Sequence, residues 1–197
     1  MAIAFALLTL VGSLAVAAIL VALHVLPTGL SPFRNPVSQY ALTRFGSGYR
    51  AATIAAAIAG GAAAAFIGTV IIGTAATVTV VLLIVFAASR LAIGFFPMDA
   101  PDSSASRTGV AHNLLAIVAF GSITAAAFVA GGAFHDGGNP GLATLSTMTG
   151  IIMAVGTVGM LLTRRGAARS LFGAAERLIY IGFIVWFIAV GISGLSA

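Results

Sequence analysis

Asp99, His112 and Arg90 are the side chains of this sequence whose types and positions favour chemistry. Asp99 directly follows the apolar run Phe95-Phe-Pro-Met98, and His112 comes after a short polar segment. A carboxylate and an imidazole can exchange protons with a ligand, and an arginine binds anions. An apolar setting raises the pKa of a carboxyl group unless an arginine lies near it. We therefore predict Asp99 and His112 as acid/base residues and Arg90 as an anion clamp.

Asp99 and Arg90 also have simpler interpretations. Asp99 could be an ordinary loop residue. Arg90 could form an ion pair with Asp99 inside the protein, or it could contact a lipid phosphate, because a long side chain near a helix end reaches the membrane surface at little cost. The sequence leaves these alternatives open.

Further polar residues are expected at the same end of the protein as Asp99, His112 and Arg90. The segment from His24 to Arg50 has prolines at positions 27, 32 and 36, which interrupt a helix, and its aromatic residues suit a membrane interface. The alternative is an interfacial plug that binds no ligand. A second polar segment runs from Arg90 to Asn113. From the two segments we predict a set of ligand-binding residues: His24, Ser38, Tyr40, Arg90, Arg107 and Asn113.

The histidines raise the question of a metal or a haem. His24, Asp99 and His112 have ligand types that zinc accepts, and a His24–His112 pair could hold a single b haem. No helix carries two histidines one turn apart, and His135 belongs to the opposite end of the protein. Lone histidines that cap helices are the commoner case. We therefore predict no metal site, with His24, Asp99 and His112 as the remaining possibility, and leave the cofactor unknown.

These residues must be positioned by elements that suit a membrane. Of the 197 residues, 60% are hydrophobic and only 7% are charged, and long apolar runs recur along the whole chain. A soluble domain would restrict apolar residues to one stripe of each helix, whereas lipid tolerates helices that are apolar all round. The composition therefore predicts an all-α, polytopic integral membrane protein.

Apolar runs of about 20 residues, the length that crosses a bilayer, predict a single domain, residues 1–197, with six transmembrane helices. The break between the second and third helices is the least marked, because only Gly73-Thr-Ala-Ala-Thr77 separates two long apolar runs. The first run lacks a positively charged start, so we expect a mature helix and no cleaved leader. The predicted helices cover residues 3–25, 51–72, 77–96, 109–130, 143–162 and 178–195.

The basic residues predict the orientation. All nine Lys and Arg positions are arginines, and they fall in or beside three of the five links between the predicted helices. Cytoplasmic loops carry the positive excess, so we expect these links in the cytoplasm, both termini outside, and a multi-pass protein of the inner (plasma) membrane. The formal charge of +5 then faces anionic lipids, and nucleic acid is not an expected partner. The sequence has no cysteine, which excludes disulfides and thiolate chemistry.

Two segments resemble a known family. Leu26-Pro-Thr-Gly-Leu-Ser-Pro32, continued by Asn35-Pro-Val-Ser38, occurs together with Phe96-Pro-Met-Asp-Ala-Pro101 and Arg107-Thr-Gly-Val-Ala-His-Asn113. This pairing is similar to the bacterial six-helix membrane proteins grouped as domain of unknown function nine-nine-eight, and the likeness covers nearly the whole chain. The resemblance implies a six-helix fold and a site in these segments, but no reaction.

Three function classes remain. Arginines, histidines and polar loop groups at one mouth favour a protein that binds, and could process, a lipid or other anionic amphiphile at its cytoplasmic face. Helices rich in Ala and Gly also suit an accessory or assembly subunit of a larger membrane complex, or a homo-oligomer. A small transporter or a single-haem protein is the third class, because six helices are few for a transporter and no inverted repeat is visible. Whether the protein is an enzyme is left open.

Overall fold

The computed structural model describes residues 1–101, 103–163 and 167–196. Within these ranges the chain is helical and has no β-strand. It contains two 3₁₀ segments, η1 (Val37–Leu42) and η2 (Ala167–Leu171). All six α-helices are long and apolar enough to cross a membrane, which confirms the predicted all-α fold. They are α1 (Ala2–Val25), α2 (Gly46–Val70), α3 (Thr74–Ile93), α4 (Arg107–Asp136), α5 (Pro140–Leu162) and α6 (Phe172–Leu195).

The helices differ from the predicted spans at their ends. α2 begins five residues before the predicted start at residue 51, α4 extends to Asp136, and α6 begins at Phe172 instead of residue 178. The predicted spans were counted from apolar residues, whereas a helix continues through polar residues that lie outside the hydrocarbon core. The break between α2 and α3 is where it was expected, and Gly73 makes it with a φ of 134°, which favours glycine.

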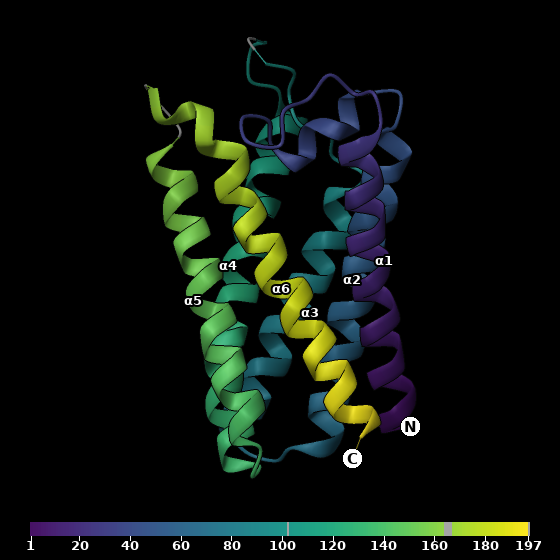
Figure 1. The fold of residues 1–197 in the computed structure, drawn as a ribbon, viewed down its shortest axis with the longest axis vertical. Coiled ribbons are helices and arrows are strands. Elements are labelled where there is room, and N and C mark those ends of the chain that lie inside the picture. Colours follow the sequence, from purple (N-terminus) through teal and green to yellow (C-terminus); the bar gives the residue numbers. More distant parts are fainter. Residues whose placement is uncertain (102, 164–166, 197) are drawn as a thin grey trace.

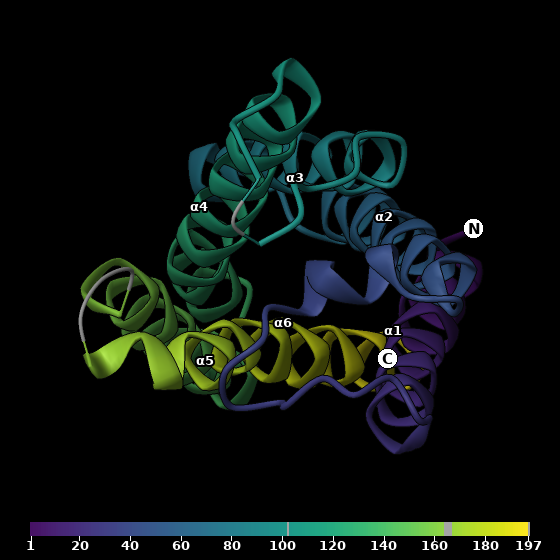
Figure 2. The ribbon, with the colours of Figure 1, turned by 90° about the horizontal axis from the view of Figure 1, so that it is seen from above.

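The six helices form a closed ring. Each helix packs against its neighbours in sequence, and α6 packs against α1 to complete the ring. Both termini lie at one end of the molecule (Figure 1). The α1–α2, α3–α4 and α5–α6 links lie at the other end, which we call the loop end. Figure 2 looks down on the loop end and shows η1 lying inside the ring.

Aromatic side chains fill the centre of the ring below the loop end. Phe86 of α3 contacts Phe183 and Phe187 of α6 with ring centroids 5.6 and 5.8 Å apart. The buried Trp186 donates a hydrogen bond from Nε1 to the Ser146 hydroxyl at 2.8 Å. Gly60 of α2 leaves the room for Phe86, because a Cβ at that glycine would collide with the phenyl ring. The small residues of α2 therefore pack inside this bundle.

The outer surface of the ring is apolar. Large aliphatic side chains on every helix are exposed, as bilayer contact requires. Examples are Leu7, Ile58, Val81, Ile117, Ile151 and Ile181. Together with the six spanning helices, this surface makes the chain a multi-pass membrane protein.

The described arginines are all at or near the loop end. Arg34 and Arg44 lie in the α1–α2 link, and Arg169 lies in η2. The others lie within the first two turns or the last turn of a helix: Arg50, Arg90, Arg107 and Arg177. Arg164 and Arg165, which were also assigned to this side, lie outside the described residues. The folded chain thus keeps the described arginines at one end of the bundle, which is the asymmetry from which the orientation was predicted.

Candidate functional site

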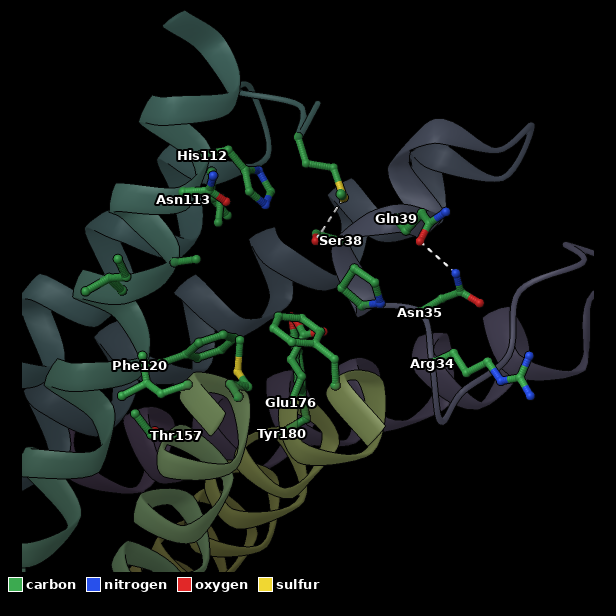
Figure 3. A pocket seen from close by; sticks show the side chains of 18 of the residues that line it. Arg34, Asn35, Ser38, Gln39, His112, Asn113, Phe120, Thr157, Glu176 and Tyr180 are labelled. Atoms are coloured by element: carbon green, nitrogen blue, oxygen red, sulfur yellow. Dashed lines mark hydrogen bonds between the residues drawn. The ribbon is translucent and has the colours of Figure 1, made fainter. Parts of the chain in front are cut away.

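A cavity of about 820 Å³ opens at the loop end. Its walls come from η1 and the chain before it, the starts of α2 and α6, the end of α3 and the link after it, the first half of α4, the end of α5, and η2. Figure 3 shows His112 and Asn113 on one side of the cavity and Glu176 and Tyr180 on another. The buried Phe86 and Phe183 each lie about one turn from a lining residue, Arg90 and Tyr180 respectively, on the side of the terminal end.

Arg90 forms part of the deep wall. It is only 1% exposed, its Nη2 donates a hydrogen bond to the Tyr180 hydroxyl at 2.9 Å, and its guanidinium lies 5.2 Å from the centre of the Tyr180 ring. The buried Nε has no hydrogen-bond partner among the described residues. A guanidinium has five donors, so Arg90 retains donors for a ligand. The ion pair between Arg90 and Asp99, both of which are described, is not formed, and that alternative is wrong.

Glu176 faces the same cavity and was missing from the predicted site. It is 4% exposed, and its Oε2 accepts a hydrogen bond from the Val37 backbone N–H at 2.6 Å. The sequence did contain a signal, because Glu176 comes two residues before the predicted span at residue 178, and an acidic residue at membrane depth is costly and by default functional. Tyr49 and Tyr180, two buried lining residues, carried no such signal, since an aromatic residue in or beside an apolar run is ordinary core.

His112 lies in the cavity wall, as predicted. It is 3% exposed, and its Nδ1 is 2.7 Å from the Phe96 carbonyl oxygen. A carbonyl oxygen only accepts, so Nδ1 carries the proton and donates it. The Nε2 atom has no hydrogen-bond partner in the described part of the chain and can accept a hydrogen bond from a ligand.

Polar side chains of the α1–α2 link form the rim. Ser38 donates a hydrogen bond to the Met98 sulfur at 3.2 Å, and Asn35 donates to the Gln39 side-chain oxygen at 2.9 Å (Figure 3). Asn113 lines the opposite rim from α4 and is exposed. The structure therefore places Ser38 and Asn113 where the sequence predicted a ligand.

Asp99 lies outside the cavity and holds Ser106, the N-cap residue of α4. Its carboxylate accepts hydrogen bonds from the Ser106 backbone N–H at 3.1 Å and from the Ser106 hydroxyl at 2.5 Å. The Ser106 hydroxyl oxygen in turn accepts the Gly109 N–H at 3.0 Å, an N-cap of the usual kind. The two bonds from Ser106 hold the pKa of Asp99 below its ordinary value. The expectation that an apolar setting raises this pKa is wrong, and the predicted catalytic role gains no support from this position.

His24 and Tyr40 are also outside the cavity lining. The Nδ1 of His24 donates to the Leu20 carbonyl, and its Nε2 accepts a hydrogen bond from the Arg177 Nε at 2.7 Å. The fully buried Tyr40 packs against the His24 ring with centroids 5.5 Å apart. Both residues hold the α1–α2 link onto the bundle and do not face a ligand.

The remaining metal hypothesis is not supported by this geometry. Both ring nitrogens of His24 are engaged, and the Asp99 carboxylate is bonded to Ser106. In the described ranges His24, Asp99 and His112 do not converge into a set of metal ligands. Arg107, another predicted ligand residue, is exposed at the first position of α4 and does not line the cavity.

One flank of the cavity reaches the lipid-facing surface between α4 and α5. Ile117 and Leu161 line the cavity and are 58% and 59% exposed. Gly121 lies beside them on α4, and a Cβ there would meet no atom within 4 Å. The cavity thus combines a polar inner wall with an apolar side opening, and its lining on α4 extends from His112 to Gly121, about 14 Å along the helix.

The comparisons with known proteins identify a family without an activity. No curated protein and no solved structure gives a significant match to the chain. A model of a family described as "Protein of unknown function (DUF998)" matches residues 10–193. The match spans both segments that carried the resemblance and the walls of the cavity. The chain therefore belongs to the DUF998 family.

Proposed function

We propose that the protein binds an amphiphile whose headgroup carries a phosphate or carboxylate group in the loop-end cavity. The headgroup contacts Arg90 and His112 at the polar wall, and the apolar tail leaves through the opening between α4 and α5. A lipid enters from the adjacent leaflet by this route without crossing water.

The observation that carries the proposal is the state of Arg90. A buried charge is costly unless it is paired, and the described partner of Arg90 is the neutral Tyr180 hydroxyl. Its Nε is buried and has no partner among the described residues. A phosphate or carboxylate bonded to this fork would offset the cost with charge-assisted hydrogen bonds.

The leaflet follows from the arginines. Basic residues gather on the cytoplasmic side of membrane proteins, and here they gather at the loop end, with both termini at the opposite end. We accordingly assign the cavity to the cytoplasmic leaflet of the plasma membrane and the termini to the outside.

The proposed activity is binding. Proton transfer by Asp99 and His112 together would require both side chains to face the ligand, and only His112 lines the cavity. A reaction would have to use other groups in addition to His112.

Native mass spectrometry of the gently extracted protein tests this proposal. Wild-type protein is expected to retain an amphiphile that carries a phosphate or carboxylate group, and Arg90→Gln is expected to lower its occupancy about tenfold or more, the loss of roughly one charge-assisted hydrogen bond. Arg107→Gln is the matched control, because Arg107 is exposed and outside the cavity.

Two outcomes would contradict the proposal. Equal retention by wild type and Arg90→Gln would remove Arg90 from the site. Stoichiometric protein partners with no specific small ligand would favour the accessory-subunit alternative.

A further inference from the structure

Two buried side chains of opposite charge face the same cavity without forming an ion pair. Arg90 is 1% exposed and Glu176 is 4% exposed, and both line the cavity. The ion pair found among the described residues, His135 with Asp136, is exposed at the far end of the bundle. A direct pair would have neutralised both charges at once, so their separation needs an explanation.

The arrangement of α6 sets the separation. Tyr180 accepts the hydrogen bond from Arg90, and Glu176 lies four residues earlier, one helical turn or about 6 Å nearer the loop end. The Arg90 guanidinium, held by Tyr180, therefore lies deeper in the cavity wall, and the Glu176 carboxylate lies about one helical turn nearer the loop end. Figure 3 shows Glu176 and Tyr180 together on this side of the cavity.

Glu176 has acceptor capacity left for a ligand. Its Oε2 accepts the Val37 N–H at 2.6 Å, whereas Oε1 has no hydrogen-bond partner in the described ranges. A carboxylate can accept several hydrogen bonds. The free oxygen therefore suits a donor, and a positively charged donor best of all.

We propose that the bound headgroup is zwitterionic and carries a primary ammonium as well as a phosphate, as in a phosphoethanolamine lipid. This inference rests on the proposed function. The phosphate binds Arg90, and the ammonium, nearer the loop end, donates to Glu176. A purely anionic headgroup would bring its charge towards the Glu176 carboxylate and offer no donor to it, which is unfavourable in a buried site.

A trimethylammonium headgroup meets a different obstacle. It has the same charge as a primary ammonium but no N–H donor. It would exclude water from the free oxygen of Glu176 without forming a hydrogen bond, and an unmet buried acceptor is costly. The site should therefore distinguish ethanolamine from choline headgroups.

Competition between lipids, followed by native mass spectrometry, tests the inference. Detergent-purified protein is titrated with phosphatidylethanolamine, phosphatidylglycerol and phosphatidylcholine that carry the same acyl chains. Wild type is expected to prefer phosphatidylethanolamine over each of the others about tenfold. Glu176→Gln is expected to abolish this preference while its side-chain carbonyl still accepts the Val37 N–H, so the local fold is retained.

Asp136→Asn is the matched control, because it removes a carboxylate that is 78% exposed at the opposite end. It should leave the preference unchanged. Thermal unfolding of Glu176→Gln, compared with wild type, verifies that the variant is folded.

The outcomes separate this inference from the proposed function. Wild type could bind phosphatidylglycerol at least as tightly as phosphatidylethanolamine, with binding of both lost in Arg90→Gln. That result would contradict the proposal of a zwitterionic headgroup but would still support the amphiphile site. An unchanged preference in Glu176→Gln would also overturn the zwitterion. Wild type that retains none of the three lipids specifically would overturn both.

Discussion

At the residue scale, Arg177 connects the chain above the cavity to the bundle. Its Nε donates to His24 at 2.7 Å, and its Nη1 donates to the carbonyl oxygens of Asn35 and Gly173 at 2.9 Å each. Gly173 allows this approach, since a Cβ there would collide with the Asn35 and Pro32 carbonyl oxygens. One guanidinium therefore fixes the end of α1 and the α1–α2 link to α6.

Replacing this guanidinium should loosen the link. Arg177→Lys keeps the charge but cannot reproduce the planar fork, so the hydrogen bond to His24 or to Asn35 is lost. We expect faster amide hydrogen exchange over residues 26–36, about tenfold for a loss of roughly 1–1.5 kcal/mol. Arg107→Lys serves as the control. Unchanged exchange in Arg177→Lys would show that other contacts hold the link.

Asp99 gives the start of α4 a dependence on pH. Its pKa is lowered from 3.8 by the hydrogen bonds from Ser106. The stabilisation from the ionised carboxylate is therefore fully present above that value and is lost as the pH falls through the lowered pKa. Asp99→Asn should raise amide exchange over residues 103–110 at neutral pH. The difference from wild type should disappear in strong acid, and a difference that persists there would contradict the carboxylate's role.

The residues show what a sequence can reveal about such a site. Ser106 as a cap of α4 could be predicted from its type and position, and Ser38, Arg90, His112 and Asn113 were predicted near a ligand and line the cavity. The role of Asp99 could not be predicted. The sequence shows the apolar residues before it, but its hydrogen bonds to Ser106 depend on how the loop between them folds. Local sequence does not determine how such a loop folds.

At the element scale, α4 and α5 are close in one half and apart in the other. Near the terminal end, a Cβ at Gly131 would collide with the Thr147 hydroxyl, and one at Gly150 would crowd the Phe128 ring. Near the loop end the cavity separates the helices, and Gly121 faces open space. Gly131 and Gly150 thus allow α4 and α5 to pack closely near the terminal end, and the side opening lies near the loop end, where the helices are not in such close contact.

Filling this opening should exclude the amphiphile. Gly121→Phe places a ring where the tail is proposed to pass, so we expect retained lipid in native mass spectra to fall about tenfold. Gly132→Phe is the matched control, because Gly132 is also exposed on α4, a Cβ added there would meet no atom within 4 Å, and it lies outside the cavity. Equal lipid retention in both variants would count against this route.

The elements also show the limit of counting apolar residues. Six apolar runs predict six helices, because each run must bury its backbone in a bilayer. The true starts of α2 and α6 lie earlier than predicted, in polar sequence. Those extra turns carry Tyr49 and Glu176, both of which line the cavity. The turns that counting apolar residues missed therefore contribute two of the buried side chains of the cavity, alongside Arg90, His112 and Tyr180 from the predicted spans.

At the scale of the whole molecule, the orientation can be tested directly. The chain has no cysteine, so Ser104→Cys at the loop end and Asp136→Cys at the opposite end each introduce a single thiol at an exposed position. In intact cells a membrane-impermeant maleimide should label Asp136→Cys and should label Ser104→Cys only after permeabilisation. The reverse pattern would move the cavity to the outer leaflet.

The aromatic cluster at the centre of the ring has a consequence for lipid distribution. The buried Phe86, Phe183 and Phe187 pack against one another about one to two turns beyond Arg90 and Tyr180, towards the terminal end. A lipid that bound as proposed, through the side between α4 and α5, would then have to return to the monolayer from which it came, because packed aromatic side chains occupy the centre of the bundle beyond the cavity. Exchange by this route would leave the difference in lipid composition between the two monolayers intact.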